Sequence, residues 1–173
     1  MSALTQNKFL NDVELKKLKK LLKKNRGERD AILISIGLYT GARCQEILNI
    51  RKRDIKNKTI TIRGLKGSND RTIPIVNKEF YIDLLQYIKE LNNDDKLFNI
   101  STRRVRAIWE LYKPNPNLGF HCLRHTVGVL LYSSSKDILA VKTILGHKSI
   151  DSTMIYMNFV ESNKVLKEVM KCL

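Results

Sequence analysis

The sequence is poor in cysteine, and it contains no apolar run long enough to cross a membrane. Its three cysteines (Cys44, Cys122 and Cys172) are scattered and form no CxxC pair, which argues against a disulfide framework or a zinc site and fits a reducing compartment. The N-terminus also lacks the charged and apolar regions of a signal peptide. We therefore expect a cytoplasmic protein with no membrane partner.

Acidic residues are scarce relative to basic ones. The chain carries 17 Asp and Glu against 32 Lys and Arg, a net charge of +15. Solubility alone could explain this excess, but the charge is spread over several segments, which favours a polyanionic partner. No helix pairs a strongly basic face with a large aromatic one, so nucleic acid is favoured over a membrane surface.

Motifs for bound cofactors are also missing. There is no glycine-rich phosphate loop of the Walker type. His121 and His125 have the i, i+4 spacing of metal ligands, but no glutamate or third ligand accompanies them. We expect neither a metal nor another cofactor.

The 173 residues suit one domain, and 43% apolar residues are enough for a buried core. The periodicity predicts a mainly α-helical protein with a small antiparallel β-sheet, an α+β fold. Two β-branched runs, residues 59–63 and 72–76, predict a hairpin with Lys66 near its tip and Pro74 on an edge strand. Apolar stripes and capping residues predict helices at about residues 11–24, 30–40, 44–50, 80–91, 101–112, 121–131 and 136–145, a short helix after Ser149 and a tail helix. Ser135 is the expected N-cap of the helix over 136–145.

The stretch from Phe120 to Tyr156 concentrates the polar residues that could carry chemistry. It contains all three histidines, with His121 and Arg124 spaced i, i+3 so that they share a helical face. Once core and capping positions are assigned, six polar residues of the whole chain remain: Arg43, Lys66, His121, Arg124, His147 and Tyr156. This set suits a phosphodiester, because cations hold the non-bridging oxygens, a tyrosine can attack phosphorus and a lysine can protonate the leaving oxygen.

At these residues the sequence resembles the catalytic domain of the tyrosine recombinases, the family of phage integrases. The matching motifs are TGARCQEIL, LKGSNDRTIPI, HCLRHT, LGHKSI and STMIY, in the family's order. The resemblance implies that Tyr156 is the nucleophile forming a 3′-phosphotyrosyl link, and that Lys66 is the general acid. It further implies that Arg43 and Arg124 bind the scissile phosphate, that His121 and His147 assist, and that Glu46 supports the site.

The resemblance implies double-stranded DNA as the partner. Basic residues outside the six-residue set are expected to contact its backbone, although a role in solvation alone remains open for some of them. These residues are Arg51, Lys52, Arg53, Arg103, Arg104 and Arg106. Two rival functions share these features: a type IB topoisomerase-like enzyme that cleaves and reseals DNA, and a catalytically silent DNA-binding module. The silent module leaves the six-residue set unexplained.

The resemblance divides the chain into three parts. Residues 1–10 are expected to be a frayed lead-in, residues 11–159 the catalytic domain, and residues 160–173 a tail helix. Family members usually carry an N-terminal domain that clamps the other face of DNA, so the chain is expected to be a fragment or a reduced protein. The tail either folds back on its own domain or docks on a neighbouring subunit. We expect a monomer in free solution and a tetramer in the synaptic complex on DNA.

Overall fold

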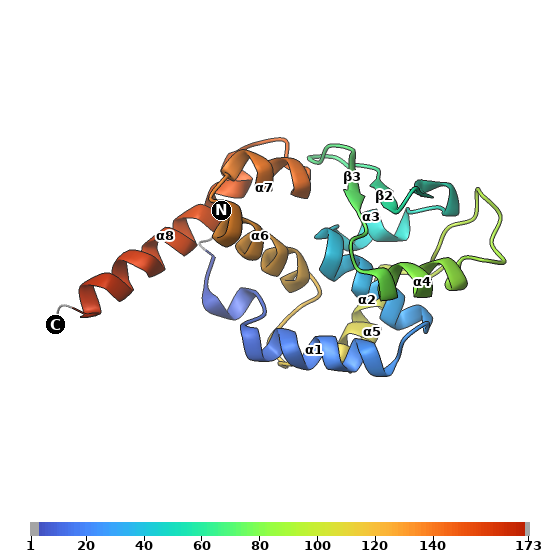
Figure 1. Ribbon diagram of the computed structural model, residues 1–173, viewed down its shortest axis with the longest axis horizontal. Helices are drawn as coiled ribbons and strands as arrows, with labels where there is room; N and C mark the ends of the chain where they lie inside the picture. Colours follow the sequence, from blue (N-terminus) through green and yellow to red (C-terminus); the bar gives the residue numbers. More distant parts are fainter. Residues whose placement is uncertain (1–3, 172–173) are drawn as a thin grey trace.

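The computed structural model describes residues 4–171, apart from the side chains of residues 167 and 168 (Figure 1). Figure 1 shows α6, α7 and α8 on one side of the molecule, α2 to α5 and the sheet on the other, and α1 running beneath. The predicted α+β class is confirmed. The elements in chain order are η1 (Gln6–Lys8), α1 (Asp12–Lys24), α2 (Arg29–Thr40), α3 (Cys44–Leu48), η2 (Lys52–Asp54), β1 (Ile55–Lys56), β2 (Thr59–Ile62), β3 (Arg71–Pro74), α4 (Lys78–Tyr87), α5 (Thr102–Tyr112), α6 (Cys122–Ser135), α7 (Ile138–Leu145) and α8 (Asp151–Lys171).

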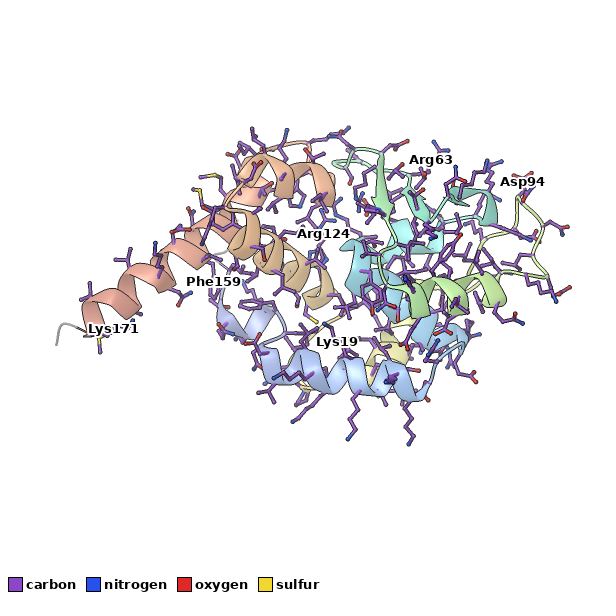
Figure 2. All side chains as sticks on the ribbon, viewed as in Figure 1. Lys19, Arg63, Asp94, Arg124, Phe159 and Lys171 are labelled. Carbon is purple, nitrogen blue, oxygen red and sulfur yellow. The ribbon has the colours of Figure 1, made fainter. Side chains whose placement is uncertain are left out.

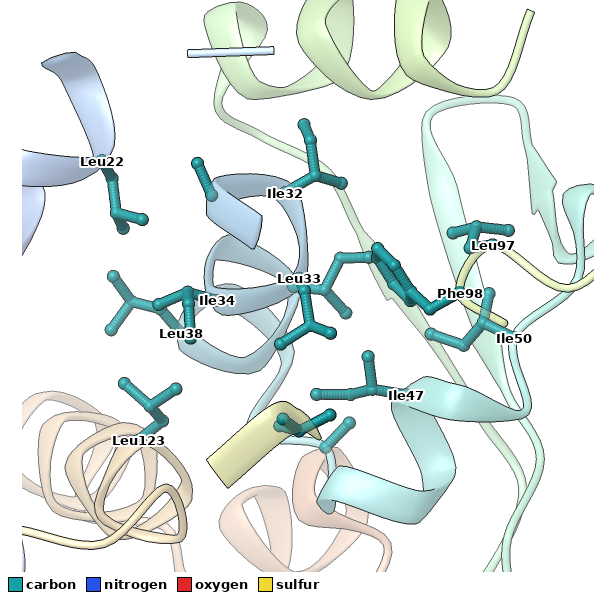
Figure 3. Close-up of a cluster of buried hydrophobic side chains, with 14 of the residues drawn as sticks. Leu22, Ile32, Leu33, Ile34, Leu38, Ile47, Ile50, Leu97, Phe98 and Leu123 are labelled. Atoms are coloured by element: carbon teal, nitrogen blue, oxygen red, sulfur yellow. The ribbon is translucent and has the colours of Figure 1, made fainter. Parts of the chain in front are cut away.

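Helix α2 is the centre of the larger hydrophobic core. Leu33, Ile34 and Ile36 are all fully buried, and neighbouring apolar side chains surround the helix (Figure 3). A helix that is apolar around its whole circumference is stable only when other elements cover every face. Gly41 ends α2 in the left-handed conformation, with φ of 62°. This abrupt end turns the chain so that Arg43 becomes the N-cap of α3.

The predicted helix starts at Asn11 and Ser101 are confirmed by their caps. The Asn11 side chain accepts from the Glu14 N–H and the Glu14 carboxylate accepts from the Asn11 N–H, a complete capping box. The Ser101 hydroxyl accepts from the Arg104 N–H at 3.2 Å. Local side-chain chemistry therefore defines the beginnings of α1 and α5.

The predicted hairpin is confirmed, and one further strand joins it. The sheet has the order β1-β2-β3 with antiparallel pairing, in which Ile60 faces Ile73. Pro74 lies on an edge strand, as expected. Strand β1 was not predicted because it has only two residues, within the basic segment 51–58.

The expected fraying before Asn11 is wrong for residues 4–10. Leu4, Phe9 and Leu10 are buried, and the Phe9 ring packs edge-on against Phe159 with 5.0 Å between centroids. The Leu10 N–H also donates to the Thr126 hydroxyl at 2.9 Å. Leu4 and Phe9 help to form a second core with α6, α7 and α8, whereas Leu10 belongs to the larger core. The segment therefore supports α6, which carries His125.

Two predicted helix boundaries near the C-terminus are wrong. Asp137, rather than Ser135, is the N-cap of α7, because Lys136 adopts a left-handed conformation and ends α6. The short helix after Ser149 and the tail helix are one continuous element, α8, of 21 residues. The predicted helix over 80–91 is also too long, because α4 ends at Tyr87.

The far half of α8 leaves the body of the molecule (Figure 1). Its apolar side chains at Val165, Leu166, Val169 and Met170 are all more than half exposed. The described part of the tail therefore does not fold back on its own domain, and residues 172 and 173 lie outside the described residues. Within the described chain, no helix combines the length and apolarity that crossing a membrane requires.

Candidate active site

Arg124 ties together the ends of two helices. It lies in the first turn of α6 with only 2% of its surface exposed, between α6 and the start of α3 (Figure 2). Its Nη1 donates to the Gly41 carbonyl at 2.8 Å, and its Nη2 donates to the Leu145 carbonyl at 2.9 Å. A guanidinium has five N–H donors, so these two bonds leave others for a ligand. Burial first, and then the charge of Arg43, lower the pKa of Arg124 to about 10.

Glu46 is a buried carboxylate between two arginines. Its Oε2 accepts from the Arg71 Nη2 at 2.7 Å and from the Arg43 backbone N–H at 2.9 Å, while its Oε1 accepts from the Arg43 Nη1 at 3.2 Å. Burial alone would raise the pKa of Glu46, but these donors outweigh it and lower the pKa to about 2. The supporting role predicted for Glu46 is consistent with this position directly beside Arg43.

Arg71 belongs to the cluster of charged residues formed by Arg43, Glu46, Arg71 and Arg124, although it was not predicted from the sequence. It is 7% exposed at the start of β3, and its Nε is buried without a hydrogen-bond partner. Side chains alternate along β3, with Arg71 and Ile73 inward and Thr72 and Pro74 outward. That alternation could have identified Arg71, because a charged residue at an inward strand position needs a buried partner.

His147 is placed by a tight connection between α7 and the hairpin. The Gly146 carbonyl accepts from the Ser68 hydroxyl at 3.1 Å and from the Asn69 N–H at 2.8 Å. Gly146 has φ of 71°, and a Cβ there would fall 2.8 Å from the Arg71 Nη1. The buried His147 ring contacts the Thr153 hydroxyl through Nδ1 at 2.8 Å. Burial, followed by the charges of Arg124, Arg43 and Arg71, lowers the pKa of His147 to about 3, so its ring is neutral at pH 7.

Tyr156, in the second turn of α8, is only 1% exposed. Its ring lies flat against Gly128 of α6, where an added Cβ would be 2.4 Å from the tyrosine Cζ. The His147 ring is parallel to it, with 6.3 Å between centroids and 4° between planes. Burial raises the pKa of Tyr156 to about 12 against the opposing effect of Arg124 and Arg43.

His125, for which the sequence analysis considered and rejected a role in metal binding, contacts the Tyr156 hydroxyl. Its Nδ1 lies 3.3 Å from the tyrosine oxygen. His121 lies at the N-cap of α6 with its ring edge-on to His125, 4.7 Å between centroids. His121 keeps an exposed edge, and desolvation of the rest of the ring, followed by the charges of Arg124 and Arg43, lowers its pKa. Its predicted proximity to Arg124 is consistent with this effect.

Lys66 is the member of the predicted set that has neither a contact nor an electrostatic interaction with the others among the described residues. It is exposed at the tip of the hairpin, and it has no hydrogen bond or ion pair with any of the described side chains or backbone groups. The bonds of Ser68 and Asn69 to Gly146 fasten the hairpin tip beside His147. Lys66 is therefore near the loop of His147, with its side chain free to reorient.

The basic residues predicted to contact DNA divide into two groups. Lys52 donates from Nζ to the Leu91 carbonyl at 2.6 Å, and Arg51 and Arg53 bond to Asp94, so all three brace the connection after α4. The second group is exposed on α5, where its members are available to an anion: Arg103, Arg104 and Arg106.

The charged cluster carries an excess of positive charge, and three of its four side chains are buried. Arg43 and Arg71 both pair with the Glu46 carboxylate, whereas Arg124 bonds only to backbone carbonyls. The charges of Arg43 and Arg71 both lower the pKa of Arg124. Such an arrangement is relieved by an anion that accepts the remaining N–H donors. Among the side chains that the structure describes, no group of three or more His, Cys, Asp and Glu residues is arranged to hold a metal ion.

We expect Arg71→Met to reduce the free energy of unfolding by about 3–5 kcal/mol, because it leaves the buried charge of Glu46 without its closest partner. Urea denaturation followed by circular dichroism measures the change. Arg53→Met is the matched control, because Arg53 pairs with Asp94 on the surface and should barely affect stability. Equal effects of the two substitutions would contradict a structural role for the Arg71–Glu46 pair.

Comparisons with known proteins identify the family of the chain. The model of the phage integrase family matches residues 8–162. Tyrosine recombinase XerA of Pyrococcus furiosus is 29% identical over 181 residues, covering 96% of this chain and 62% of the relative. Tyrosine recombinase XerH of Campylobacter jejuni subsp. jejuni is 32% identical over 170 residues, covering 87% and 48%. The chain thus spans about half to three fifths of the length of these relatives.

Solved structures show the same fold. A crystal structure of XerA recombinase superposes with a TM-score of 0.69 at 25% identity, covering 86% of this chain and 58% of that one. The catalytic domain of bacteriophage HP1 integrase gives a TM-score of 0.64 at 25% identity and covers 88% of both chains. The fold is therefore that of a tyrosine recombinase catalytic domain, and the predicted resemblance is confirmed. The chain belongs to the phage integrase family.

Proposed function

We propose that this chain is the catalytic domain of a site-specific DNA recombinase in which Tyr156 cleaves and rejoins DNA strands. The observation that carries the proposal is the position of a buried tyrosine among the charges of Arg124 and Arg43. A phosphodiester brought to these arginines would lie within the electrostatic range of the tyrosine hydroxyl. The names of the relatives support the same activity.

In the proposed reaction, the Tyr156 hydroxyl loses its proton and its oxygen forms a bond to the scissile phosphorus. The bond from phosphorus to the 5′-oxygen breaks, which leaves a 3′-phosphotyrosyl link and a 5′-hydroxyl. Arg43 and Arg124 neutralise the non-bridging oxygens as charge develops on them. His147, which is neutral at pH 7, can share a hydrogen bond with the phosphate. Because one phosphate ester replaces another, the chemistry requires neither a metal nor a nucleotide.

Lys66 is proposed to protonate the leaving 5′-oxygen. The hairpin that carries it is anchored beside His147, while the lysine itself is exposed and can turn toward DNA in the site. Gly64 and Gly67 flank it in the sequence, and Gly67 has φ of 84°. Movement of the short glycine-containing tip, without movement of the whole sheet, would therefore bring the lysine to the leaving 5′-oxygen.

The proposed partner is double-stranded DNA, and the proposed location is the nucleoid in the cytoplasm. XerH has been solved bound to its difH substrate, and the present chain superposes on it with a TM-score of 0.66 at 26% identity, covering 90% of this chain and 51% of that one. The excess of basic residues and the exposed arginines of α5 support contacts with a DNA backbone. The chain is proposed to be a monomer in solution that assembles into a tetramer on paired sites.

The experiment that tests the function is covalent trapping. The chain is incubated at low salt with nicked suicide duplexes made from genomic fragments, the denaturant-resistant adducts are isolated, and the joined DNA ends are sequenced. Attachment to a 3′-phosphate supports the proposal, whereas attachment to a 5′-phosphate or no adduct contradicts it. The trapped sequence then supplies substrates for a two-site recombination assay beside a supercoil-relaxation assay, and relaxation without recombination would favour the topoisomerase-like alternative.

The tail of α8 is proposed to dock on a neighbouring subunit. We expect the double substitution Leu166→Gln and Met170→Gln to leave binding to a single site unchanged and to remove cooperative assembly on paired sites, because both apolar side chains are about 60% exposed and would be covered by the neighbour. Gel-shift titrations with one-site and two-site DNA measure both quantities. Lys164→Gln, on the same helix, is the control, and unchanged cooperativity in the double variant would contradict the docking.

A further inference from the structure

The nucleophile proposed above needs a group that receives its proton. Tyr156 has a pKa raised to about 12, so its hydroxyl is protonated at pH 7 and cannot attack phosphorus as a phenolate without assistance. A proton acceptor must lie within hydrogen-bond reach of the hydroxyl oxygen, directly or through one water. Three histidines surround the site, and they differ in their distance and orientation to this oxygen.

His147 and His121 make their contacts with groups other than the Tyr156 hydroxyl. The His147 ring is parallel to the tyrosine ring, and its Nδ1 is engaged with the Thr153 hydroxyl at 2.8 Å. His121 packs edge-on against His125 rather than against the tyrosine. Among the described residues, neither His147 nor His121 has a direct hydrogen bond to the Tyr156 hydroxyl.

His125 is the histidine that bonds directly to the reacting oxygen, with 3.3 Å between its Nδ1 and the Tyr156 hydroxyl. Both partners are held in place. Gly128, one turn along α6, lets the tyrosine ring lie against the helix backbone, which fixes the direction of the hydroxyl. Thr126, next to His125, is bonded to the Cys122 carbonyl and to the Leu10 N–H, which holds this turn of α6 against the N-terminal segment.

We propose that His125 is a catalytic residue that orients the Tyr156 hydroxyl and accepts its proton at Nδ1 as the bond from oxygen to phosphorus forms. The inference rests on the proposed recombinase function. The step balances: the O–H bond of Tyr156 breaks, the proton goes to His125, the oxygen–phosphorus bond forms and the 5′-oxygen leaves with a proton from Lys66. Religation returns both protons by the reverse path.

The charge state of His125 fits this role. Burial first, and then His121, Arg124 and Lys8, lower its pKa to about 4, so the ring is neutral at pH 7 and, in the tautomer protonated at Nε2, has a free lone pair at Nδ1. Arrival of a phosphate at Arg124 places a negative charge near the ring, which opposes the cationic neighbours and makes His125 more basic. The proton acceptor thus becomes stronger when the substrate is bound.

The test compares the pH dependence of adduct formation in the wild-type chain and in His125→Asn, whose amide can bond to the hydroxyl but cannot take its proton. Single-turnover rates are measured at saturating DNA with a bridging 5′-phosphorothiolate substrate, whose sulfur leaving group makes the rate independent of Lys66. The wild-type rate should fall as the pH drops through the pKa of His125 in the complex. The variant should be slower by about 100-fold or more near pH 7. It should also lack this fall in rate at low pH, which is called the pH step below.

Two further variants separate the roles. His121→Asn should retain the pH step, because His121 does not touch the hydroxyl. His125→Ala, which leaves a space beside Tyr156, should recover at least about tenfold in rate when imidazole is added. A pH step retained in His125→Asn, or a DNA-binding His125→Ala that does not respond to imidazole, overturns the assignment. Failure of the wild-type chain to form any adduct through Tyr156 would instead overturn the proposed function.

Discussion

Tyr156→Phe should abolish the denaturant-resistant adduct with nicked suicide DNA, with no residual product above background. The substitution removes the only oxygen of this side chain that can bond to phosphorus, so the loss should be complete rather than graded. The phenylalanine ring should still pack against Gly128 and lie parallel to the His147 ring. The fold and the affinity for DNA should therefore be retained, because one hydrogen bond to His125 contributes only about 0.5–1.5 kcal/mol.

The measurement for this variant is denaturing gel electrophoresis of the adduct, with a gel-shift titration and thermal unfolding of the same preparation. Tyr112→Phe is a matched control, because Tyr112 is also buried but lies in α5, in the other hydrophobic cluster. It should form as much adduct as the wild-type chain. Adduct persisting in Tyr156→Phe would show that another residue is the nucleophile.

Lys66→Ala should slow cleavage of ordinary DNA by about 100- to 10,000-fold, the range typical of the loss of a general acid. On a substrate whose bridging 5′-oxygen is replaced by sulfur, cleavage should largely recover, because a thiolate leaves without protonation. Because Lys66 is exposed and has no partner in the described chain, the substitution should leave the free energy of unfolding unchanged.

Quench-flow or manual sampling of adduct formation on both substrates measures the two rates. Lys56→Ala is the control, because Lys56 is an exposed lysine of the same sheet, on β1. It should cleave both substrates at the wild-type rate. If Lys66→Ala is slowed equally on both substrates, Lys66 binds or positions DNA and does not donate a proton.

Much of the fold could be predicted from the sequence because its signals are local. The capping box at Asn11, the apolar sequence of α2 and the β-branched runs of the hairpin each act within a few residues. Errors occurred where two local signals competed. Ser135 and Asp137 are both good N-caps, and the left-handed backbone of Lys136 decides between them.

The candidate site was only partly predictable, because some of its members are defined by distant neighbours. Arg71 is recognisable as a site residue only once Glu46, 25 positions away in the sequence, lies 2.7 Å from it. The contact of His125 with Tyr156 joins α6 to α8 across 31 positions. Burial of Phe9 and Leu10 likewise depends on Phe159 of α8 and on α6. Such pairings follow from tertiary packing, which periodicity and spacing do not encode.

The two carbonyl bonds of Arg124 couple folding to ligand binding. The side chain expected to hold the phosphate also joins the last turn of α2 to the last turn of α7. Substrate affinity and native-state stability therefore depend on the same guanidinium. A substitution of Arg124 should change the affinity for the phosphate and the free energy of unfolding together. The exposed side chains of the α5 arginines make no such bonds in the described chain, so substitutions there should change the proposed contact with DNA without this loss of stability.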